Sequence, residues 1–194
     1  ALVRYKGETI VKTPMDYNLA IEIAKDIISV PNCEVLLSGE KTAYIMPKTE
    51  EYLIRMTKVV QYKTTIIKSL DEIQEDILKV SVCDLSGIAN SEKYFADKWS
   101  DKAAAAVSGD QYMDFMDLCV SKGDALKKVQ KIYGIDRSEC MAFGDNYNDC
   151  EMLKQAEFSY AMASAADDIK KNALYVTAVS YTHLRAHETG AYLV

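Results

Sequence analysis

The residues that say most about this chain are Phe143-Gly144-Asp145-Asn146-Tyr147-Asn148-Asp149. The stretch begins at the end of an apolar run, residues 140–143, which is typical of a short buried strand. A periodic segment that is typical of a helix follows the stretch. Two carboxylates and two amides therefore lie on a strand-to-helix turn, where α/β folds bind phosphates and metals. Asp145 and Asp149 can share one hard cation, and Gly144 relieves the tight backbone. The turn predicts a Mg²⁺-dependent phosphate site.

A structural alternative explains the same residues without a ligand. Asn148, followed three residues later by Glu151, resembles a capping box that starts a helix over residues 149–155. Acidic side chains are favoured at a helix N-terminus in any case. An EF-hand calcium loop is excluded, because its third ligand position would fall on Tyr147 and its obligatory glycine on Cys150. A metal site and a helix cap therefore both stay open for this turn.

The composition is that of an ordinary soluble globular protein. Of the 194 residues 49% are hydrophobic and 27% are charged, enough for one full domain or two small ones. The net charge of −6 argues against a nucleic-acid partner or an anionic membrane. Five cysteines without a C-x-x-C pair indicate a reducing compartment, and no apolar run is long enough to span a membrane. We expect a cytoplasmic protein.

The hydrophobic pattern divides the chain into two parts. Residues 1–116 predict an α+β unit with an antiparallel sheet, in which a helix beginning near Asp16 covers hairpin-like strands at 33–37 and 42–46. From Val120 onward, strands and helices alternate in the βαβαβ order that is typical of a parallel sheet. The expected fold class is α/β with a second, α+β unit.

A lysine at a helix start is a second candidate for chemistry. Lys122 lies in Ser121-Lys122-Gly123-Asp124, where its charge opposes the helix dipole by roughly a few tenths of a kcal/mol. Taken alone, it can be a solvated surface lysine. Together with the acidic turn that follows, Lys122 could neutralise a phosphoryl group while Asp145 and Asp149 hold a metal, which is the charge arrangement that phosphoryl transfer needs.

These two segments resemble the third and fourth motifs of haloacid dehalogenase-like (HAD) phosphatases of the Cof-like type, which carry a class IIB cap. Residues 161–165 and 175–177 are similar to the segment that follows the motifs, and residues 1–116 are similar to the inserted α+β cap. The resemblance implies that residues 117–177 are the C-terminal half of a Rossmann-like parallel-sheet core. Ala163-Ser164 departs from the Gly-Asn that is common in the family.

The resemblance implies a Mg²⁺-dependent phosphatase that acts on a small phosphorylated metabolite through an aspartyl-phosphate. Lys122 would anchor the phosphate, Asp145 would bind Mg²⁺, and Asn148 and Asp149 would complete or support the metal shell. A phosphomutase on the same scaffold and a non-catalytic ligand-binding or interaction module are the alternatives. The substrate and the oligomeric state are not predicted.

The implied nucleophile and acid/base aspartates belong to an Asp-x-Asp-x-Thr motif on the first core strand, and the sequence contains no Asp-x-Asp. We therefore expect a fragment that is inactive alone. Residues 178–194 do not continue the family pattern and resemble translated sequencing-adapter sequence. His183 and His187 lie in this tail at the spacing of zinc ligands, but no cysteine or acidic cluster is positioned to complete a site.

Overall fold

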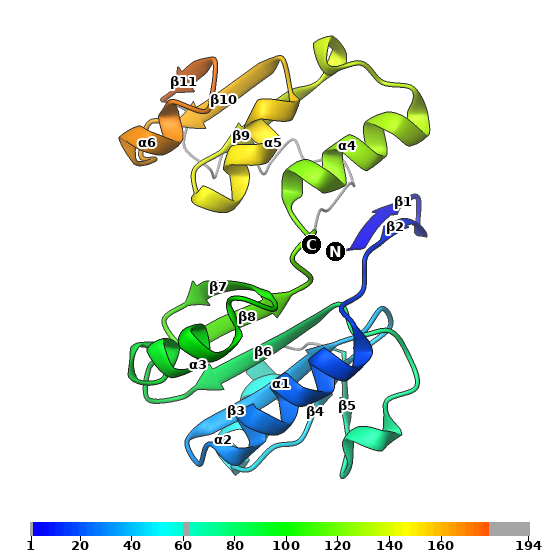
Figure 1. Ribbon diagram of the computed structural model, residues 1–194, viewed down its shortest axis with the longest axis vertical. Coiled ribbons are helices and arrows are strands. Elements are labelled where there is room, and N and C mark those ends of the chain that lie inside the picture. The colour runs from blue at the N-terminus through cyan, green and yellow to red at the C-terminus, as the bar shows by residue number, and fades with distance from the viewer. Residues whose placement is uncertain (1, 60–62, 179–194) are drawn as a thin grey trace. The chain divides into compact units, whose positions relative to one another are not determined.

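The computed structural model describes residues 2–59 and 63–178, which form two compact units (Figure 1). Unit 1 contains residues up to 12 and from 119 onward, and unit 2 contains residues 13–118. This division differs from the expected one, in which residues 1–12 belonged with the cap. They lie in unit 1 because Val3 and Val11 are buried in one hydrophobic cluster with Ala125. The expected tail beyond residue 178 lies outside the described residues.

Unit 1 has the predicted alternation of strands and helices. Its elements are the hairpin β1 (Leu2–Tyr5) and β2 (Glu8–Lys12), then α4 (Lys122–Tyr133), β9 (Met141–Gly144), α5 (Cys150–Gln155), β10 (Phe158–Met162), α6 (Asp167–Lys170) and β11 (Tyr175–Thr177). The last three strands form a sheet in the order β11-β10-β9, and both pairings are parallel. The prediction of a parallel βαβαβ unit is confirmed.

The two faces of this parallel sheet differ in cover. Ala142 on one face is buried in a cluster with Leu153 and Ala156 of the α5 region. On the other face Phe143, Tyr160 and Tyr175 lie opposite one another in register, and their stacked ring centroids are 5.0 and 5.1 Å apart. Phe143 and Tyr175 are still 37% and 46% exposed. Parallel sheets are normally covered on both faces, so this aromatic face is unusual.

Unit 2 is an α+β unit built on six strands. Its elements are α1 (Tyr17–Ser29), β3 (Cys33–Ser38), β4 (Ala43–Ile45), α2 (Glu50–Ile54), the π-helical turn η1 (Arg55–Val59), β5 (Thr64–Ile66), β6 (Lys79–Asp84), α3 (Glu92–Trp99), β7 (Ala104–Gly109) and β8 (Tyr112–Met116). The strand order is β5-β4-β3-β6-β8-β7, and only β4 and β5 pair in parallel. The expected antiparallel sheet is therefore confirmed except at its β5 edge.

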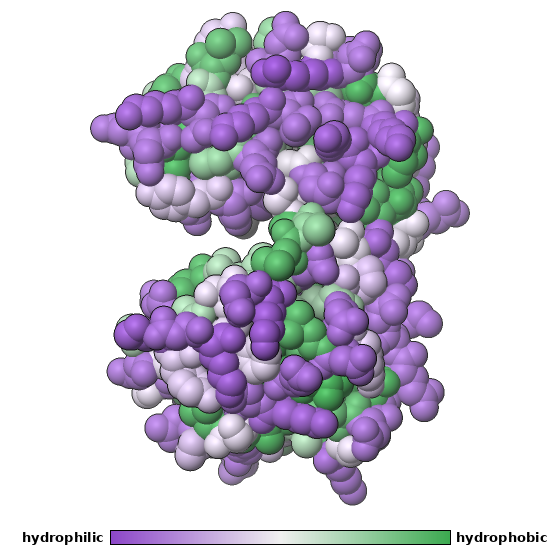
Figure 2. Space-filling view, viewed as in Figure 1, coloured by the Kyte–Doolittle hydropathy of each residue, from purple (hydrophilic) through white to green (hydrophobic). Residues whose placement is uncertain are grey.

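The main core of unit 2 lies between this sheet and the helices α1 and α3 (Figure 1). Ile23 and Ile27 of α1 and Phe95 of α3 are fully buried there against the sheet. The helix side of each strand is apolar because side chains alternate between the two faces. In the view of Figure 2 the surface is mainly hydrophilic with small hydrophobic patches, as expected for a chain in which 27% of residues are charged.

Two further findings concern the whole described chain. In these residues no helix combines the length and the apolar character needed to cross a bilayer. No disulfide joins the five cysteines, all of which lie in the described ranges.

A polar cluster around Asp26 ties α1 to α3. The Asp26 carboxylate accepts hydrogen bonds from Trp99 Nε1 at 2.8 Å, from the Tyr94 hydroxyl at 2.9 Å and from Lys98 Nζ at 2.5 Å. Burial alone would raise the pKa of Asp26, but the hydrogen bonds from Lys98, Trp99 and Tyr94 outweigh it and lower the pKa below its usual value.

We predict that Asp26→Asn lowers the free energy of unfolding at pH 7 by about 1–3 kcal/mol, because charge-assisted hydrogen bonds are lost. The folded-state pKa lies below the unfolded-state value of about 3.9, so this stabilisation is present above that pH and disappears as the pH falls through the folded-state pKa. Urea unfolding followed by Trp99, the single tryptophan, measures it. Asp97→Asn is the control, because the Lys93–Asp97 pair on α3 is exposed. Equal losses at pH 3 and pH 7 would contradict the prediction.

Candidate functional site

The acidic turn follows β9 at the edge of the parallel sheet. β9 ends at Gly144, and a single 3₁₀ turn, η5 (Tyr147–Asp149), leads into α5. Asp145 and Asn148 are exposed on this turn, whereas Asp149 is only 4% exposed. The sequence therefore placed the polar residues correctly after the strand, but the two aspartates have opposite environments.

Asp149 uses both carboxylate oxygens to organise the site. Its Oδ2 accepts the backbone N–H groups of Asp145 and Asn146, both at 3.1 Å. Its Oδ1 accepts a hydrogen bond from Lys122 Nζ at 2.6 Å. One buried carboxylate thus joins the start of α4 to the turn after β9, and it brings the predicted lysine into the acidic motif.

The helix cap is made by different residues from those expected. The Asn146 side chain accepts the N–H of Tyr147 at 2.8 Å, and Asp149 completes a capping box with Asn146. The expected pair, Asn148 and Glu151, is wrong, because the 3₁₀ turn starts the helical segment two residues earlier than the sequence pattern indicates. The capping carboxylate of Asp149 also pairs with Lys122.

Two glycines are required for this close packing. A Cβ at Gly144 would lie 2.5 Å from the Cβ of Asp149, and a Cβ at Gly123 would lie 2.6 Å from the Cβ of Glu151. Gly144 lets Asp149 fold back onto the strand end, and Gly123 lets α4 approach α5. The role of Gly123 was missed from sequence, where a glycine in the first turn of a helix is the available signal.

Tyr147 connects the turn to α6. Its hydroxyl donates to Asp168 Oδ2 at 2.9 Å. This hydrogen bond to a carboxylate stabilises the protonated phenol and raises the pKa of Tyr147 above its usual value. Nothing in the sequence indicated this pair, which lies 21 residues apart along the chain.

The donor set fits a hard cation with few protein ligands. In the described part of the chain, no hydrogen bond or ion pair engages the Asp145 carboxylate or the Asn148 side-chain amide. The same residues contain no group of three or more His, Cys, Asp or Glu that could hold a metal. Mg²⁺ is bound through one or two carboxylates and keeps several waters, so an exposed carboxylate beside an amide oxygen suits it better than a full protein cage would.

Comparison with known proteins gives the family. The model of the haloacid dehalogenase-like hydrolases matches residues 1–183. The chain belongs to this family. The 5-amino-6-(5-phospho-D-ribitylamino)uracil phosphatase YbjI of Escherichia coli strain K12 is 25% identical over 172 residues, which are 88% of this chain and 63% of that relative. The chain thus spans less than two thirds of the length of this HAD relative.

Solved structures share the fold of this chain. SMU.1108c from Streptococcus mutans UA159 is 28% identical, with a TM-score of 0.70 over 91% of this chain and 67% of that one. The HAD subclass IIB sugar phosphatase BT4131 matches with a TM-score of 0.69 over 88% of this chain and 64% of its own; at 18% identity it shows the fold alone. The expected class, a Rossmann-like HAD core with an α+β cap, is confirmed.

The buried and exposed aspartates of the turn predict different mutant effects. We expect Asp149→Ala to destabilise the β9–α5 segment by on the order of 3 kcal/mol, because it removes three hydrogen bonds and leaves Lys122 without its buried partner. Asp145→Ala, its matched control, removes an exposed carboxylate and should cost less than about 0.5 kcal/mol. Native-state hydrogen exchange of the α5 amides measures both values. Equal protection in the two variants would contradict the assigned contacts.

Proposed function

We propose that this chain carries part of the active site of a Mg²⁺-dependent phosphatase that acts on a small phosphorylated metabolite. The observation that carries the proposal is the ion pair at 2.6 Å between the half-exposed Lys122 and the buried Asp149, next to a turn that leaves Asp145 and Asn148 exposed. The turn follows the carboxyl end of a parallel strand, where α/β folds bind phosphates, and this supports Lys122 as the phosphate donor and Asp145 and Asn148 as the oxygen ligands.

Each residue has a separate role in this proposal. Lys122 remains 40% exposed although it donates to Asp149, so its ammonium group has donors left for a phosphate oxygen. Asp145 and Asn148 would hold Mg²⁺, and Asp149 would support that shell by fixing the turn and the lysine. The chemistry that Mg²⁺ supplies when bound in such a site is orientation of the phosphate and compensation of its developing charge.

The nucleophile is the part of the site that these residues do not supply. HAD membership supports attack on phosphorus by an aspartate, with a second aspartate as acid and base. The 194 residues contain no Asp-x-Asp. We therefore propose that they bind and neutralise phosphate without being able to cleave its ester.

The relatives suggest the class of substrate. One is named for a phosphorylated ribitylaminouracil, and another is called a sugar phosphatase. A phosphorylated sugar or polyol derivative is the common chemistry of these names. The net charge of −6 supports the expectation that neither nucleic acid nor an anionic membrane is the partner, and the absence of disulfides among the five cysteines is compatible with a cytoplasmic location.

We predict that MgCl₂ shifts the backbone amide resonances of residues 144–149 in an NMR titration of the whole chain. Asp145→Asn should abolish these shifts, because the charged ligand is removed. Glu157→Gln, the matched control, removes an exposed carboxylate outside the turn and should retain the shifts. Unchanged Mg²⁺ shifts in Asp145→Asn would contradict the proposed ligand.

We also predict no hydrolysis of p-nitrophenyl phosphate by the purified chain in the presence of Mg²⁺. The reason is that no residue in the sequence forms the expected pair of reacting aspartates. Release of p-nitrophenol is measured against a buffer blank and against the Asp145→Asn variant. Turnover that requires Mg²⁺ and disappears in Asp145→Asn would show that the chain holds a nucleophile of its own.

A further inference from the structure

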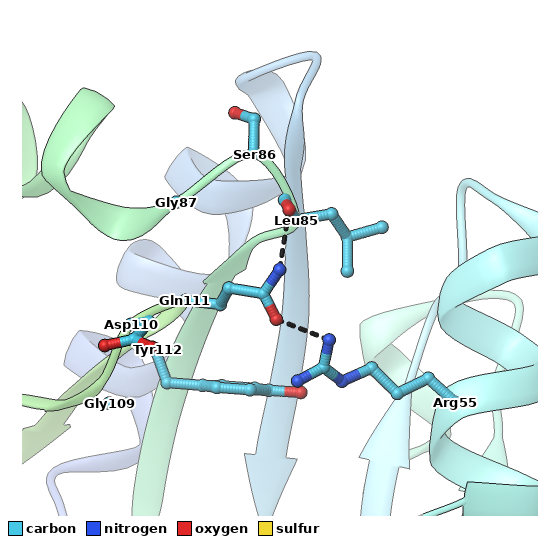
Figure 3. Close-up of a pocket in the computed structure, with 8 residues that line it drawn as sticks. All are labelled: Arg55, Leu85, Ser86, Gly87, Gly109, Asp110, Gln111 and Tyr112. Carbon is cyan, nitrogen blue, oxygen red and sulfur yellow. Dashed lines mark hydrogen bonds between the residues drawn. The ribbon is translucent and has the colours of Figure 1, made fainter.

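A cavity of about 580 Å³ is lined by described residues of unit 2 (Figure 3). None of these residues belongs to the proposed phosphatase site. The cavity lies where β6 ends and where the β7–β8 hairpin turns, and the start of η1 forms its other side. Eight residues line it, namely Arg55, Leu85, Ser86, Gly87, Gly109, Asp110, Gln111 and Tyr112. The pocket is open to solvent rather than enclosed.

Arg55 is the cation of this cavity. Its Nη1 donates to Gln111 Oε1, and Gln111 Nε2 donates to the carbonyl oxygen of Leu85 at 2.6 Å (Figure 3). The guanidinium carbon also lies 5.5 Å from the centroid of the Tyr112 ring. The glutamine and the tyrosine therefore hold the guanidinium in place through neutral groups.

The charge of Arg55 is not neutralised by a protein carboxylate. Among the described residues, no ion pair involves Arg55, and Asp110 lies on the opposite side of the cavity in Figure 3. The guanidinium donates to Gln111 and also hydrogen-bonds the Tyr112 hydroxyl, and the remaining N–H donors of its planar fork are available to a ligand. Such a fork matches the oxygens of a carboxylate or a phosphate in a bidentate manner.

The walls of the cavity are fixed by the backbone. Gly87 and Gly109 have φ values of +115° and +152°, which other residues rarely adopt, and they add no side chain to the space. Asp84 is 2% exposed and anchors the loop by accepting the N–H of Ser86 at 3.0 Å. Ile88 N donates to the Asp110 carbonyl at 2.9 Å and joins the two loops. The site is therefore organised before a ligand arrives.

The position of Arg55 supplies a second, independent observation. Arg55 is the first residue of the π-helical turn η1, where α2 changes its hydrogen-bond pattern. π-Helical turns are rare and occur frequently at functional sites, because they displace one side chain from the regular helical path. The first residue of this π-helical turn is thus the cation that lines the cavity among the described residues.

We propose that this cavity is a binding site for a small oxyanion, a carboxylate or phosphate group, held by the guanidinium of Arg55. The rest of such a ligand would lie against Leu85 and the Tyr112 ring. All lining residues belong to unit 2, so the proposal does not depend on the phosphatase function proposed for unit 1.

The test is an NMR titration of the whole chain with sodium acetate and, separately, with sodium phosphate at constant ionic strength. At least one anion should shift the amide resonances of Gly87, Gly109, Gln111 and Tyr112. Arg55→Gln should weaken this binding at least about tenfold. Arg55→Lys should weaken it less, because lysine keeps the positive charge but lacks the planar pair of N–H donors of a guanidinium. Lys58→Gln, which removes an exposed charge from the same turn, should leave it unchanged.

The outcomes separate this site from the phosphatase site. Acetate binding without phosphate binding would identify the group as a carboxylate, and the reverse would identify a phosphate. Phosphate shifts confined to residues 122 and 145–149, and abolished by Lys122→Gln, would belong to unit 1, and they would overturn the proposal for unit 2 if acetate also left the lining amides unshifted. The proposal is also overturned if neither anion shifts the lining amides, or if Arg55→Gln and Arg55→Lys, shown to be folded by their spectra, bind as tightly as the wild type.

Discussion

The architecture of the site depends on the buried carboxylate of Asp149. A carboxylate that is 4% exposed is costly unless charged and polar donors surround it. Lys122 and two backbone amides provide those donors, and they can do so only because Gly144 and Gly123 allow the strand end, the turn and the two helices to approach. The stability requirement of one residue therefore fixes the positions of the lysine and of the exposed Asp145.

The two units contribute different kinds of chemistry to the protein. Unit 1 presents the Lys122–Asp149 pair at the edge of a parallel sheet whose opposite face exposes aromatic rings, and the chain spans 63% of its E. coli relative. Unit 2 has a well-buried core and carries its own cationic cavity around Arg55.

The sequence pattern correctly predicted the features that depend on neighbouring residues alone. The apolar run before Gly144 and the lysine at the start of α4 gave the strand, the turn and the motif, because these features need no distant partner. The cap was misassigned to Asn148 since a 3₁₀ turn cannot be told from an α-helical start by periodicity. The hairpin at residues 2–12 and the pairing of Tyr147 with Asp168 depend on contacts between distant segments. The cavity around Arg55 likewise needs a helical turn and two loops that are distant in sequence.

We propose that the buried Asp149 supports the Mg²⁺ site by holding Lys122 and the turn, whereas the exposed Asp145 binds the metal ion. A crystal structure of the chain grown with Mg²⁺ tests it most directly. We expect a metal ion about 2.1 Å from a carboxylate oxygen of Asp145, with the Lys122–Asp149 pair intact. A metal ion bound by Asp149 with Lys122 displaced, or no metal at the turn at saturating Mg²⁺, would contradict it.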